Sequence, residues 1–222
     1  MATTIVLITG ANRGIAGNRD PNHPTSKALL DLPKAEGTTL YIIKIDATVS
    51  TDPADAVKHL ASLGIDHLDI VIANAGIAYI WPKVSEVKVE DMQKHTIPNT
   101  YGIIWLYQAT LPLLKKSKSP KWVSIGSSAA FLTNAAYAPT KVVLHWLTKA
   151  IHQEEPELCA FPVDLGWVQT DLGQAGADAF GYEKAAITVE ESVSGLIKVI
   201  DASSRETHGG KLWVYDGQQV PW

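Results

Sequence analysis

A tyrosine and a lysine four residues apart occur twice in this sequence, as Tyr79 with Lys83 and as Tyr137 with Lys141. On a helix this spacing places the phenol and the ammonium group on one face. The ammonium group favours the phenolate, so it should lower the pKa of the tyrosine and let the phenol exchange protons near neutral pH. Both pairs enclose a proline, but the first lies in a predicted loop, whereas the second begins a predicted helix, in whose first turn Pro139 is tolerated. Tyr137 and Lys141 are therefore the candidate catalytic pair.

Two serines lie just upstream of that pair. The run Gly126-Ser127-Ser128 follows the predicted strand Trp122–Ile125. Hydroxyl groups at the carboxyl end of a strand lie where open α/β sheets bind ligands. We therefore expect Ser127, with Ser128 as the alternate, to share one crevice with Tyr137 and Lys141.

A glycine-rich turn, TGANRG, follows the first predicted strand and runs from Thr9 to Gly14. Glycines let the backbone turn tightly there and approach phosphates without a Cβ in the way. Arg13 and Arg19 are two of the three arginines in the chain. Either could face a 2′-phosphate, which would favour NADP over NAD. The alternative is a surface turn with two solvated arginines.

The elements that must position these residues can be read from the apolar runs, which are nearly continuous, as in strands buried on both faces. The predicted strands are Thr4–Ile8, Leu40–Ile45, Leu68–Ala73, Trp122–Ile125, Leu158–Val163 and Leu212–Tyr215. Strands that alternate with helices predict a doubly wound, Rossmann-like parallel sheet, here in a single domain of residues 1–222. The predicted helices are Ala54–Leu63 after a Thr51-Asp52-Pro53 cap, Asn99–Lys115, Tyr137–Glu154, and Val189–Ala202 after a capping box from Thr188 to Glu191.

The start of the chain is irregular. Between Gly10 and Thr38 such a fold should have a helix, a strand and a second helix, but the only helical candidate is about Thr25–Leu32. A crossover between parallel strands needs roughly a dozen residues, so there is room for one such unit. The sequence therefore predicts that the first crossover helix and the second strand are deleted. Because every strand must pair, we expect Leu40–Ile45 to lie directly beside Thr4–Ile8.

Composition excludes several classes of protein. The net charge is −4 and the pI about 6.0, with no basic stripe, so we expect no nucleic-acid partner. No apolar run approaches the roughly 20 residues of a membrane span, and the N-terminus does not read as a signal peptide, so a cytoplasmic protein is expected. Cys159, the single cysteine, lies in an apolar run and reads as a core residue. No two histidines have helical metal-ligand spacing, so no metal site is predicted.

Several motifs occur in the order typical of one family. They are TGANRGI, IANAG at Ile72–Gly76, Asn99, VSIGSS, YAPTK, and DLGWVQTDLG at Asp164–Gly173. Together they resemble the short-chain dehydrogenase/reductase family over nearly the whole chain. The pieces GWVQTDLGQAGA and DGQQVPW are similar to its fungal norsolorinic acid ketoreductase-like branch. That resemblance implies NADPH-dependent reduction of ketones on aromatic polyketides, and a homodimer or homotetramer.

The resemblance also implies a role for each catalytic residue. Tyr137 would protonate the carbonyl oxygen of a small-molecule substrate. Lys141 would lower the pKa of Tyr137 and hold the nicotinamide ribose. Ser127 would hydrogen-bond the carbonyl, and Asn99 would kink its helix and hold a water that relays protons to Lys141.

The same resemblance implies an NADP(H) site at the carboxyl edge of the sheet. Asp46 and Ala47 would flank the adenine, and Gly166, Val168 and Thr170 would contact the nicotinamide amide and the phosphates. The full expected set is Gly10, Asn12, Arg13, Gly14, Ile15, Arg19, Asp46, Ala47, Asn74, Ala75, Gly76, Tyr137, Lys141, Gly166, Val168 and Thr170.

The chain also departs from the family pattern. Ala16 stands where a third glycine is expected, and the missing helix would remove the N–H groups and the dipole that anchor a pyrophosphate. It would also uncover an apolar face of the sheet. The other departures are the ten-residue spacing from Ser127 to Tyr137, Pro98 before Asn99, and Leu165 in place of proline before Gly166.

Three interpretations follow. The first is an NADPH-dependent ketoreductase, in which Trp81 and Trp167 could stack on a flat aromatic substrate, ordinary packing being the alternative for both. The second is a family relative without redox chemistry, which binds a ligand or catalyses a cofactor-free rearrangement or dehydration. The third is a product of segment loss from an active reductase, through a skipped exon or engineering.

Overall fold

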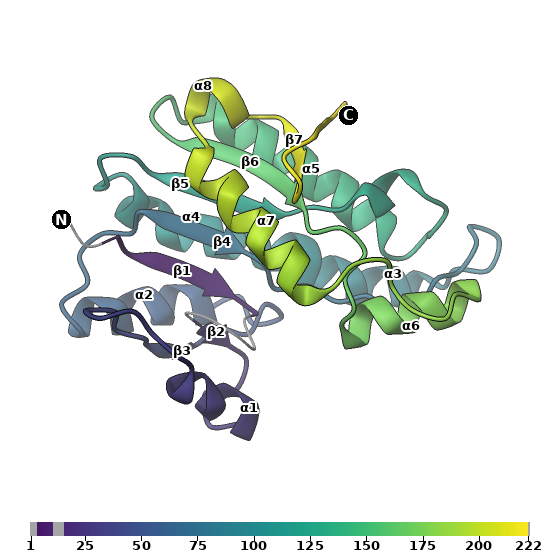
Figure 1. Cartoon of the computed structure of the whole chain (residues 1–222), viewed down its shortest axis with the longest axis horizontal. Coiled ribbons are helices and arrows are strands. Elements are labelled where there is room, and N and C mark those ends of the chain that lie inside the picture. Colours follow the sequence, from purple (N-terminus) through teal and green to yellow (C-terminus); the bar gives the residue numbers. More distant parts are fainter. Residues whose placement is uncertain (1–3, 11–15, 222) are drawn as a thin grey trace.

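A computed structural model describes residues 4–10 and 16–221, and a twisted sheet lies at its centre (Figure 1). Within the described part the strand order is β3-β2-β1-β4-β5-β6-β7-β8. All neighbouring strands are parallel except the last pair, which is antiparallel. The strands are β1 (Val6–Thr9), β2 (Ala16–Asn18), β3 (Ile42–Lys44), β4 (Ile70–Ala73), β5 (Lys121–Ile125), β6 (Cys159–Asp164), β7 (Leu212–Val214) and β8 (Gln219–Val220).

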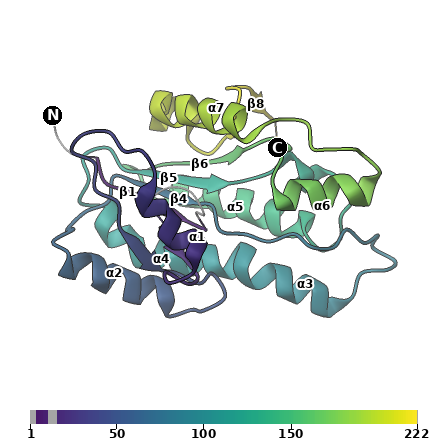
Figure 2. The same cartoon turned by 60° about the horizontal axis from the view of Figure 1, so that its bottom comes forward.

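Helices cover both faces of this sheet, which confirms the predicted fold class. α2, α4 and α5 lie on one face, and α7 lies across the other (Figure 2). Two short 3-10 helices lie at Ala28–Asp31 and Ser128–Phe131, and a π-helical segment lies at Ile97–Tyr101. The helices are α1 (Pro24–Lys27), α2 (Asp52–Ser62), α3 (Val89–Thr96), α4 (Gly102–Leu114), α5 (Ala138–Glu154), α6 (Asp171–Phe180), α7 (Val189–Ala202) and α8 (Arg205–His208).

The helix predictions were accurate where apolar periodicity is strong. α7 has the predicted bounds, but Thr188 makes only half of the predicted capping box, accepting from the Glu191 N–H at 3.1 Å. The predicted Thr51 cap of α2 makes no side-chain hydrogen bond, and the helix already begins at Asp52. Helices α3 and α6 were not predicted: both are short, α3 carries few apolar residues, and α6 contains two glycines, which are poor helix formers.

The second strand is present, so two predictions about the start of the chain were wrong. In β2, Ala16 pairs with Ile8 of β1, and Asn18 pairs with Lys44 of β3. β3 therefore lies beside β2 and not beside β1. Gly17 permits this arrangement, because a Cβ there would lie 2.8 Å from the Cδ1 atom of Ile45. Three small residues without an apolar run form a strand only because two neighbours supply the hydrogen bonds on either side.

The predicted loss of the first crossover helix stays a prediction, because residues 11–15 lie outside the described residues. Residues 10–15 alone connect β1 to β2, fewer than the dozen or so that a helical crossover needs. One face of β1 and β4 is correspondingly only partly covered. Their residues alternate between buried and half-buried, whereas every residue of β6 is buried. The prediction of strands buried on both faces thus holds for the middle of the sheet and not for β1 and β4.

Most of the core lies in two layers that sandwich the sheet, and a small third cluster packs Leu29 near Ala16 of β2. One layer lies against α2, α4 and α5 and includes Leu7, Val71, Leu106, Trp122 and Leu144. The other layer lies against α7 and includes Val123, Phe161, Val199 and Cys159. Cys159 is 5% exposed, and burial raises the pKa of its thiol to about 11, so its prediction as a core residue is confirmed.

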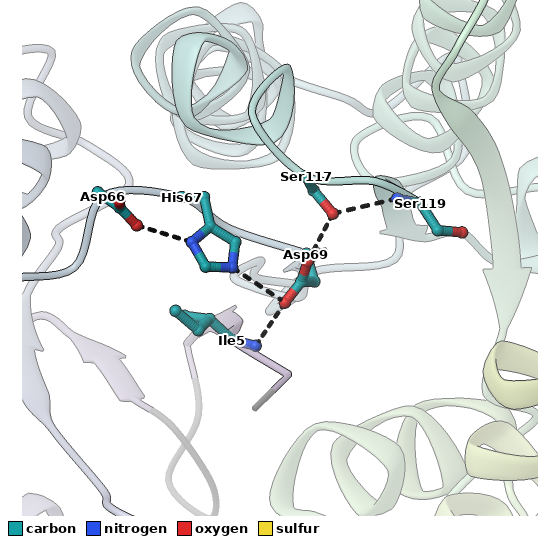
Figure 3. Close-up of polar contacts among 6 residues, drawn as sticks. All are labelled: Ile5, Asp66, His67, Asp69, Ser117 and Ser119. Atoms are coloured by element: carbon teal, nitrogen blue, oxygen red, sulfur yellow. Dashed lines mark hydrogen bonds and ion pairs between the residues drawn. The ribbon is translucent and has the colours of Figure 1, made fainter. Parts of the chain in front are cut away.

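A polar cluster joins three segments at the amino edge of the sheet, opposite the carboxyl ends of the strands (Figure 3). Its centre is Asp69, whose Oδ2 accepts from the Ile5 N–H at 2.8 Å and whose Oδ1 accepts from the Ser117 hydroxyl. His67 lies between Asp66, at 2.8 Å, and Asp69, at 3.6 Å. One carboxylate thereby connects the segment before β1, the start of β4 and the turn after α4.

Replacement of Asp69 by alanine should lower the free energy of unfolding by about 2–4 kcal/mol, because the half-buried Ile5 N–H and the Ser117 hydroxyl lose a charged acceptor. Urea denaturation followed by circular dichroism measures this change. The matched control is Asp66→Ala, which removes an exposed partner of His67 only. Equal unfolding midpoints for the two variants would show that Asp69 does not connect these segments.

Candidate active site

Four candidate catalytic residues reach the carboxyl edge of the sheet from different elements. Ser127 follows β5, Tyr137 immediately precedes α5, and Lys141 lies in its first turns. Asn99 lies in the π-helical segment Ile97–Tyr101 between α3 and α4. The parallel sheet brings them together because the carboxyl ends of its strands share one edge.

The turn after β5 fixes the position of Ser127. The Ser127 N–H donates to Nε2 of His145 at 3.2 Å, and its Oγ accepts from the Ala129 N–H at 3.1 Å. The Ser127 side chain also lies close enough to Tyr137 to lower the pKa of its phenol as a hydrogen-bond partner does. The ten-residue spacing in the sequence therefore still allows this contact. Ser128, the alternate, instead begins a turn with its N–H on Asp164.

Burial controls the protonation of Tyr137 and Lys141. It raises the pKa of Tyr137 well above its usual value, the hydrogen bond from Ser127 opposes this, and Asp164 raises the pKa further. Lys141 Nζ lies 5.5 Å from the centre of the Tyr137 ring and donates to the Ile125 carbonyl at 2.7 Å. The expected lowering of the Tyr137 pKa was therefore wrong for this structure, because desolvation of the phenol is the largest influence and the charge of Asp164 adds to it. The phenol is protonated, as a general acid must be.

The pKa of Lys141 itself is lowered to about 8. Burial is the main cause, since the residue is only 4% exposed, and the charge of Asp164 opposes the change. Near neutral pH the ammonium form therefore still predominates, but with a small margin.

Asn99 is fully buried and joins three segments. Its Oδ1 accepts from the Ile77 N–H at 2.8 Å, and its Nδ2 donates to the Ile77 carbonyl at 2.9 Å and to Thr140 Oγ1 at 3.1 Å. The predicted irregularity in its helix is observed as the π-helical segment. Such a widened turn also accommodates Pro98, which has no N–H to continue an α-helix. Gly76 packs closely here, since a Cβ on it would lie 3.2 Å from Asn99 Oδ1 and 3.8 Å from Lys141 Nζ.

The second tyrosine–lysine pair lies outside this arrangement, as predicted. Tyr79 is 46% exposed and stacks on His95 with ring centres 4.3 Å apart. Its hydroxyl faces Asp91 at 3.4 Å, and both burial and that carboxylate raise its pKa.

The ends of β1 and β4 form the part of the expected cofactor site that the structure describes. Gly10 has φ +62°, and a Cβ on it would lie 2.6 Å from the Cα atom of Ala75, so only glycine fits. Its N–H donates to the Gly17 carbonyl at 2.9 Å. Asn74 donates from Nδ2 to the carbonyls of Thr9, at 2.9 Å, and Gly10, at 3.2 Å. Gly10, Asn74, Ala75 and Gly76 therefore lie on one continuous surface.

The other expected cofactor residues are spread along the same edge. Arg19 follows β2 and is exposed. Asp46 and Ala47 follow β3; the Asp46 carboxylate accepts from the Thr48 N–H at 2.8 Å, and Ala47 packs against Gly102 of α4. The predictions for Asn12, Arg13, Gly14 and Ile15 lie outside the described residues.

The loop after β6 carries the last three expected residues. Gly166 has φ +76° and packs against Ile187, Val168 forms a bridge with Ile187, and Thr170 caps α6 by accepting from the Gly173 N–H at 3.1 Å. Leu165 stands in place of the family's proline, and its carbonyl accepts from the Ser192 hydroxyl at 2.7 Å.

The two tryptophans expected near the cleft both pack on or near α6. Trp81 meets Phe180 edge-on with ring centres 6.5 Å apart, and Trp167 meets Tyr182 at 5.2 Å. The Trp167 indole N–H donates to the Gly173 carbonyl at 3.0 Å. Both side chains are partly buried, so each packs against the protein and still exposes part of its ring to solvent.

Sequence reasoning missed two residues that hold this site, Asp164 and His145. His145 continues the four-residue spacing of Tyr137 and Lys141 along α5, a signal that could have revealed it. It is fully buried, and burial followed by the charge of Lys141 lowers its pKa to about 4. It is therefore neutral at physiological pH, and Nε2 is free of a proton when it accepts from the Ser127 N–H.

Residues 4–10 and 16–221 contain neither a candidate metal site nor a helix that could span a membrane. No three His, Cys, Asp or Glu side chains gather in a way that could hold a metal ion. None of the helices combines the length and apolar character needed to cross a membrane.

Comparisons with known proteins agree with the predicted family and branch. Residues 4–179 match the family described as short chain dehydrogenase. The norsolorinic acid ketoreductase of Dothistroma septosporum is 36% identical over 248 residues, covering 99% of this chain and 92% of that protein. The one from Emericella nidulans is 35% identical, covering 99% and 94%. Since these alignments are longer than the 222 residues of this chain, the relatives carry residues that it lacks.

A solved structure shows the same architecture. The NADPH-bound carbonyl reductase from chicken fatty liver superposes with a TM-score of 0.83 over 100% of both chains, at 25% sequence identity. The fold, the residues gathered at the carboxyl edge and these similarities lead to one conclusion: the chain belongs to the short-chain dehydrogenase/reductase family of oxidoreductases.

Proposed function

We propose that this protein is an NADPH-dependent ketoreductase that reduces a ketone on an aromatic, polyketide-type secondary metabolite. The main support is the convergence of Ser127, Tyr137, Lys141 and Asn99 on one edge of the sheet. The similarity to norsolorinic acid ketoreductases supports the substrate class.

In this proposal Tyr137 donates its proton to the carbonyl oxygen of the substrate. Ser127, whose side chain already contacts Tyr137, hydrogen-bonds the same oxygen and orients it. Lys141 stabilises the phenolate that forms and holds the nicotinamide ribose, and Asn99 anchors the water that returns protons to Lys141. NADPH, when bound, supplies the hydride.

The described residues fit this cofactor in part. Gly10, Asn74, Ala75 and Gly76 offer a closely packed backbone surface, and the exposed Arg19 follows β2, where it would face the 2′-phosphate. The partly buried Trp81 and Trp167 offer flat apolar surface to an aromatic substrate.

Calorimetric titration should show one NADPH per chain with micromolar affinity and weaker binding of NADH. Arg19→Ala should weaken NADPH binding about tenfold, the loss expected for one charge-assisted contact, and leave NADH binding unchanged. Lys34→Ala, which removes a positive charge bonded to the Leu30 carbonyl, is the matched control. Equal losses for both cofactors would contradict a phosphate contact at Arg19.

A second candidate function is favoured by the short connection of residues 10–15. A helix N-terminus normally anchors the pyrophosphate at this place, and no crossover helix fits there. The protein would then be a relative without redox chemistry that binds a ligand or catalyses a cofactor-free rearrangement or dehydration. The absence of NADPH binding in the same titration would favour this function, or a product of segment loss from an active reductase. Sequencing the transcript distinguishes these two.

The proposal includes self-association as a homodimer or homotetramer. Its support is a set of exposed or partly exposed apolar side chains at the start of α4 and on α5, namely Tyr101, Trp105, Val142 and Trp146. We also propose a cytoplasmic location, since the single, buried Cys159 requires no oxidising compartment.

A further inference from the structure

The side chain of Asp164 connects the two loops that border the proposed site. It ends β6 and is 7% exposed. Its Oδ2 accepts from the Ser128 N–H at 2.7 Å, and its Oδ1 accepts from the Gly166 N–H at 2.9 Å. The first loop carries Ser127, and the second carries residues expected to contact the nicotinamide. Both carboxylate oxygens are thus committed to backbone N–H groups at the carboxyl edge of the sheet.

Asp164 also supplies negative charge to the buried centre of the site. Lys141 Nζ donates to the carbonyl of Ile125 in β5, and Ile125 pairs with Val163 of β6, the residue before Asp164. Gly76 and Asn99 pack beside Nζ, and the Tyr137 ring lies 5.5 Å from it. The charge of Asp164 favours the charged form of Lys141, and the charge of Lys141 acts in turn on His145. His145 is neutral and the phenol is protonated. The carboxylate of Asp164 therefore balances the charge of the Lys141 ammonium group.

We propose that Asp164 is a positioning residue with two effects: it holds the Ser127 turn and the Gly166 loop in register, and it keeps Lys141 charged at neutral pH. The importance of Asp164 for catalysis rests on the proposed function. Its effects on the two loops and on the charge of Lys141 can be measured whether or not the protein is a reductase. Loss of the carboxylate would leave two N–H groups without their acceptor and Lys141 without its nearby counter-charge.

The charge effect is tested by titrating Lys141 directly. In protein labelled with carbon-13 at lysine Cε, the Lys141 signal is assigned by its loss in Lys141→Arg, and its chemical shift is followed with pH. The wild-type midpoint is expected near pH 8. In Asp164→Asn it should fall by about 0.5–1 pH unit, because an opposite charge that favours the ammonium form is gone. Asp55→Asn, which removes an exposed carboxylate of α2 bonded to Lys58, should leave it unchanged.

The loop effect is tested by amide hydrogen exchange at Ser128 and Gly166. Exchange at one or both should become at least about tenfold faster in Asp164→Asn, because a single acceptor oxygen then remains for two N–H groups. Asp164→Glu separates the two effects: it keeps the charge and the Lys141 midpoint, but its longer side chain should still speed exchange at both amides. Unchanged exchange at both in Asp164→Asn, or an unchanged Lys141 midpoint, would overturn the corresponding half of the proposal. If Asp164→Asn fails to fold, exchange at Ser128 and Gly166 in Asp164→Glu decides whether Asp164 holds the two loops. A Lys141 midpoint far below pH 8 in the wild-type protein would then overturn the charge effect.

These measurements do not depend on turnover. A wild-type protein without reductase activity would contradict the proposed function, yet the midpoint and the exchange rates would still report on Asp164. If the protein is active, the alkaline limb of kcat against pH should move to lower pH in Asp164→Asn together with the Lys141 midpoint. A purely structural role would lower kcat without moving that limb.

Discussion

Tyr137→Phe is expected to lower kcat for reduction of an aromatic ketone by about 10²–10⁴-fold, the usual contribution of a general acid. The substitution removes only the hydroxyl group, so the ring keeps its place beside Lys141, whose Nζ lies 5.5 Å from the ring centre. Oxidation of NADPH at saturating ketone, followed by its absorbance, measures the change. NADPH affinity should remain within about twofold of wild type, because the proton is transferred to the substrate and not to the cofactor.

Tyr79→Phe is the matched control for this substitution. It alters the other tyrosine with a lysine four residues later, and its exposed hydroxyl faces Asp91 outside the site. Turnover by this variant should equal that of wild type. A Tyr137→Phe enzyme with unchanged kcat would contradict the proposed mechanism, and a matching loss in Tyr79→Phe would show that the assay responds to general damage.

The convergence of the candidate catalytic residues could be predicted because these are reactive residue types at fixed places relative to strand ends. Ser127 follows an apolar run, and Tyr137 and Lys141 begin a strongly periodic helix. Topology then brings them together without further information. The π-helical segment at Asn99 was expected as a kink from the family resemblance, and its neighbour Pro98 makes an uninterrupted α-helix unfavourable there.

What could not be predicted depends on burial and on neighbours distant in sequence. Ala16-Gly17-Asn18 contains no apolar run, and it becomes β2 only because β1 and β3 supply partners on both sides. The pKa of Tyr137 was assigned the wrong direction because desolvation is not visible from a four-residue spacing. The sequence shows Asp164 only as the first residue of the DLGWVQTDLG motif. Its contacts could not be predicted because they depend on two loops that meet at the end of β6.

Gly10→Ala is expected to lower the free energy of unfolding by about 2–5 kcal/mol and to weaken NADPH binding at least about tenfold. A positive φ disfavours alanine by about 1–2 kcal/mol, and forcing an extra methyl group into a packed contact costs about 1–3 kcal/mol more. Gly10 has φ +62°, and its new Cβ would lie 2.6 Å from the Ala75 Cα and 3.0 Å from the Ala75 Cβ. The backbone of β1 or of the β4 loop must therefore move, and both line the expected cofactor site. Denaturant titration and calorimetry measure the two effects.

Gly64→Ala isolates the contact from the backbone strain. Gly64 follows α2 with φ +79°, and a Cβ there would meet no atom within 4 Å. Gly64→Ala should therefore lower the free energy of unfolding only by the cost of a positive φ, about 1–2 kcal/mol, and leave NADPH affinity unchanged. The difference between the two variants measures how tightly the end of β1 is packed on Ala75. If both variants lose equal stability, the close approach of these two segments is not maintained in solution. If Gly10→Ala loses stability but binds NADPH as tightly as wild type, the cofactor does not lie against this turn, and the pyrophosphate must be held elsewhere along the carboxyl edge of the sheet.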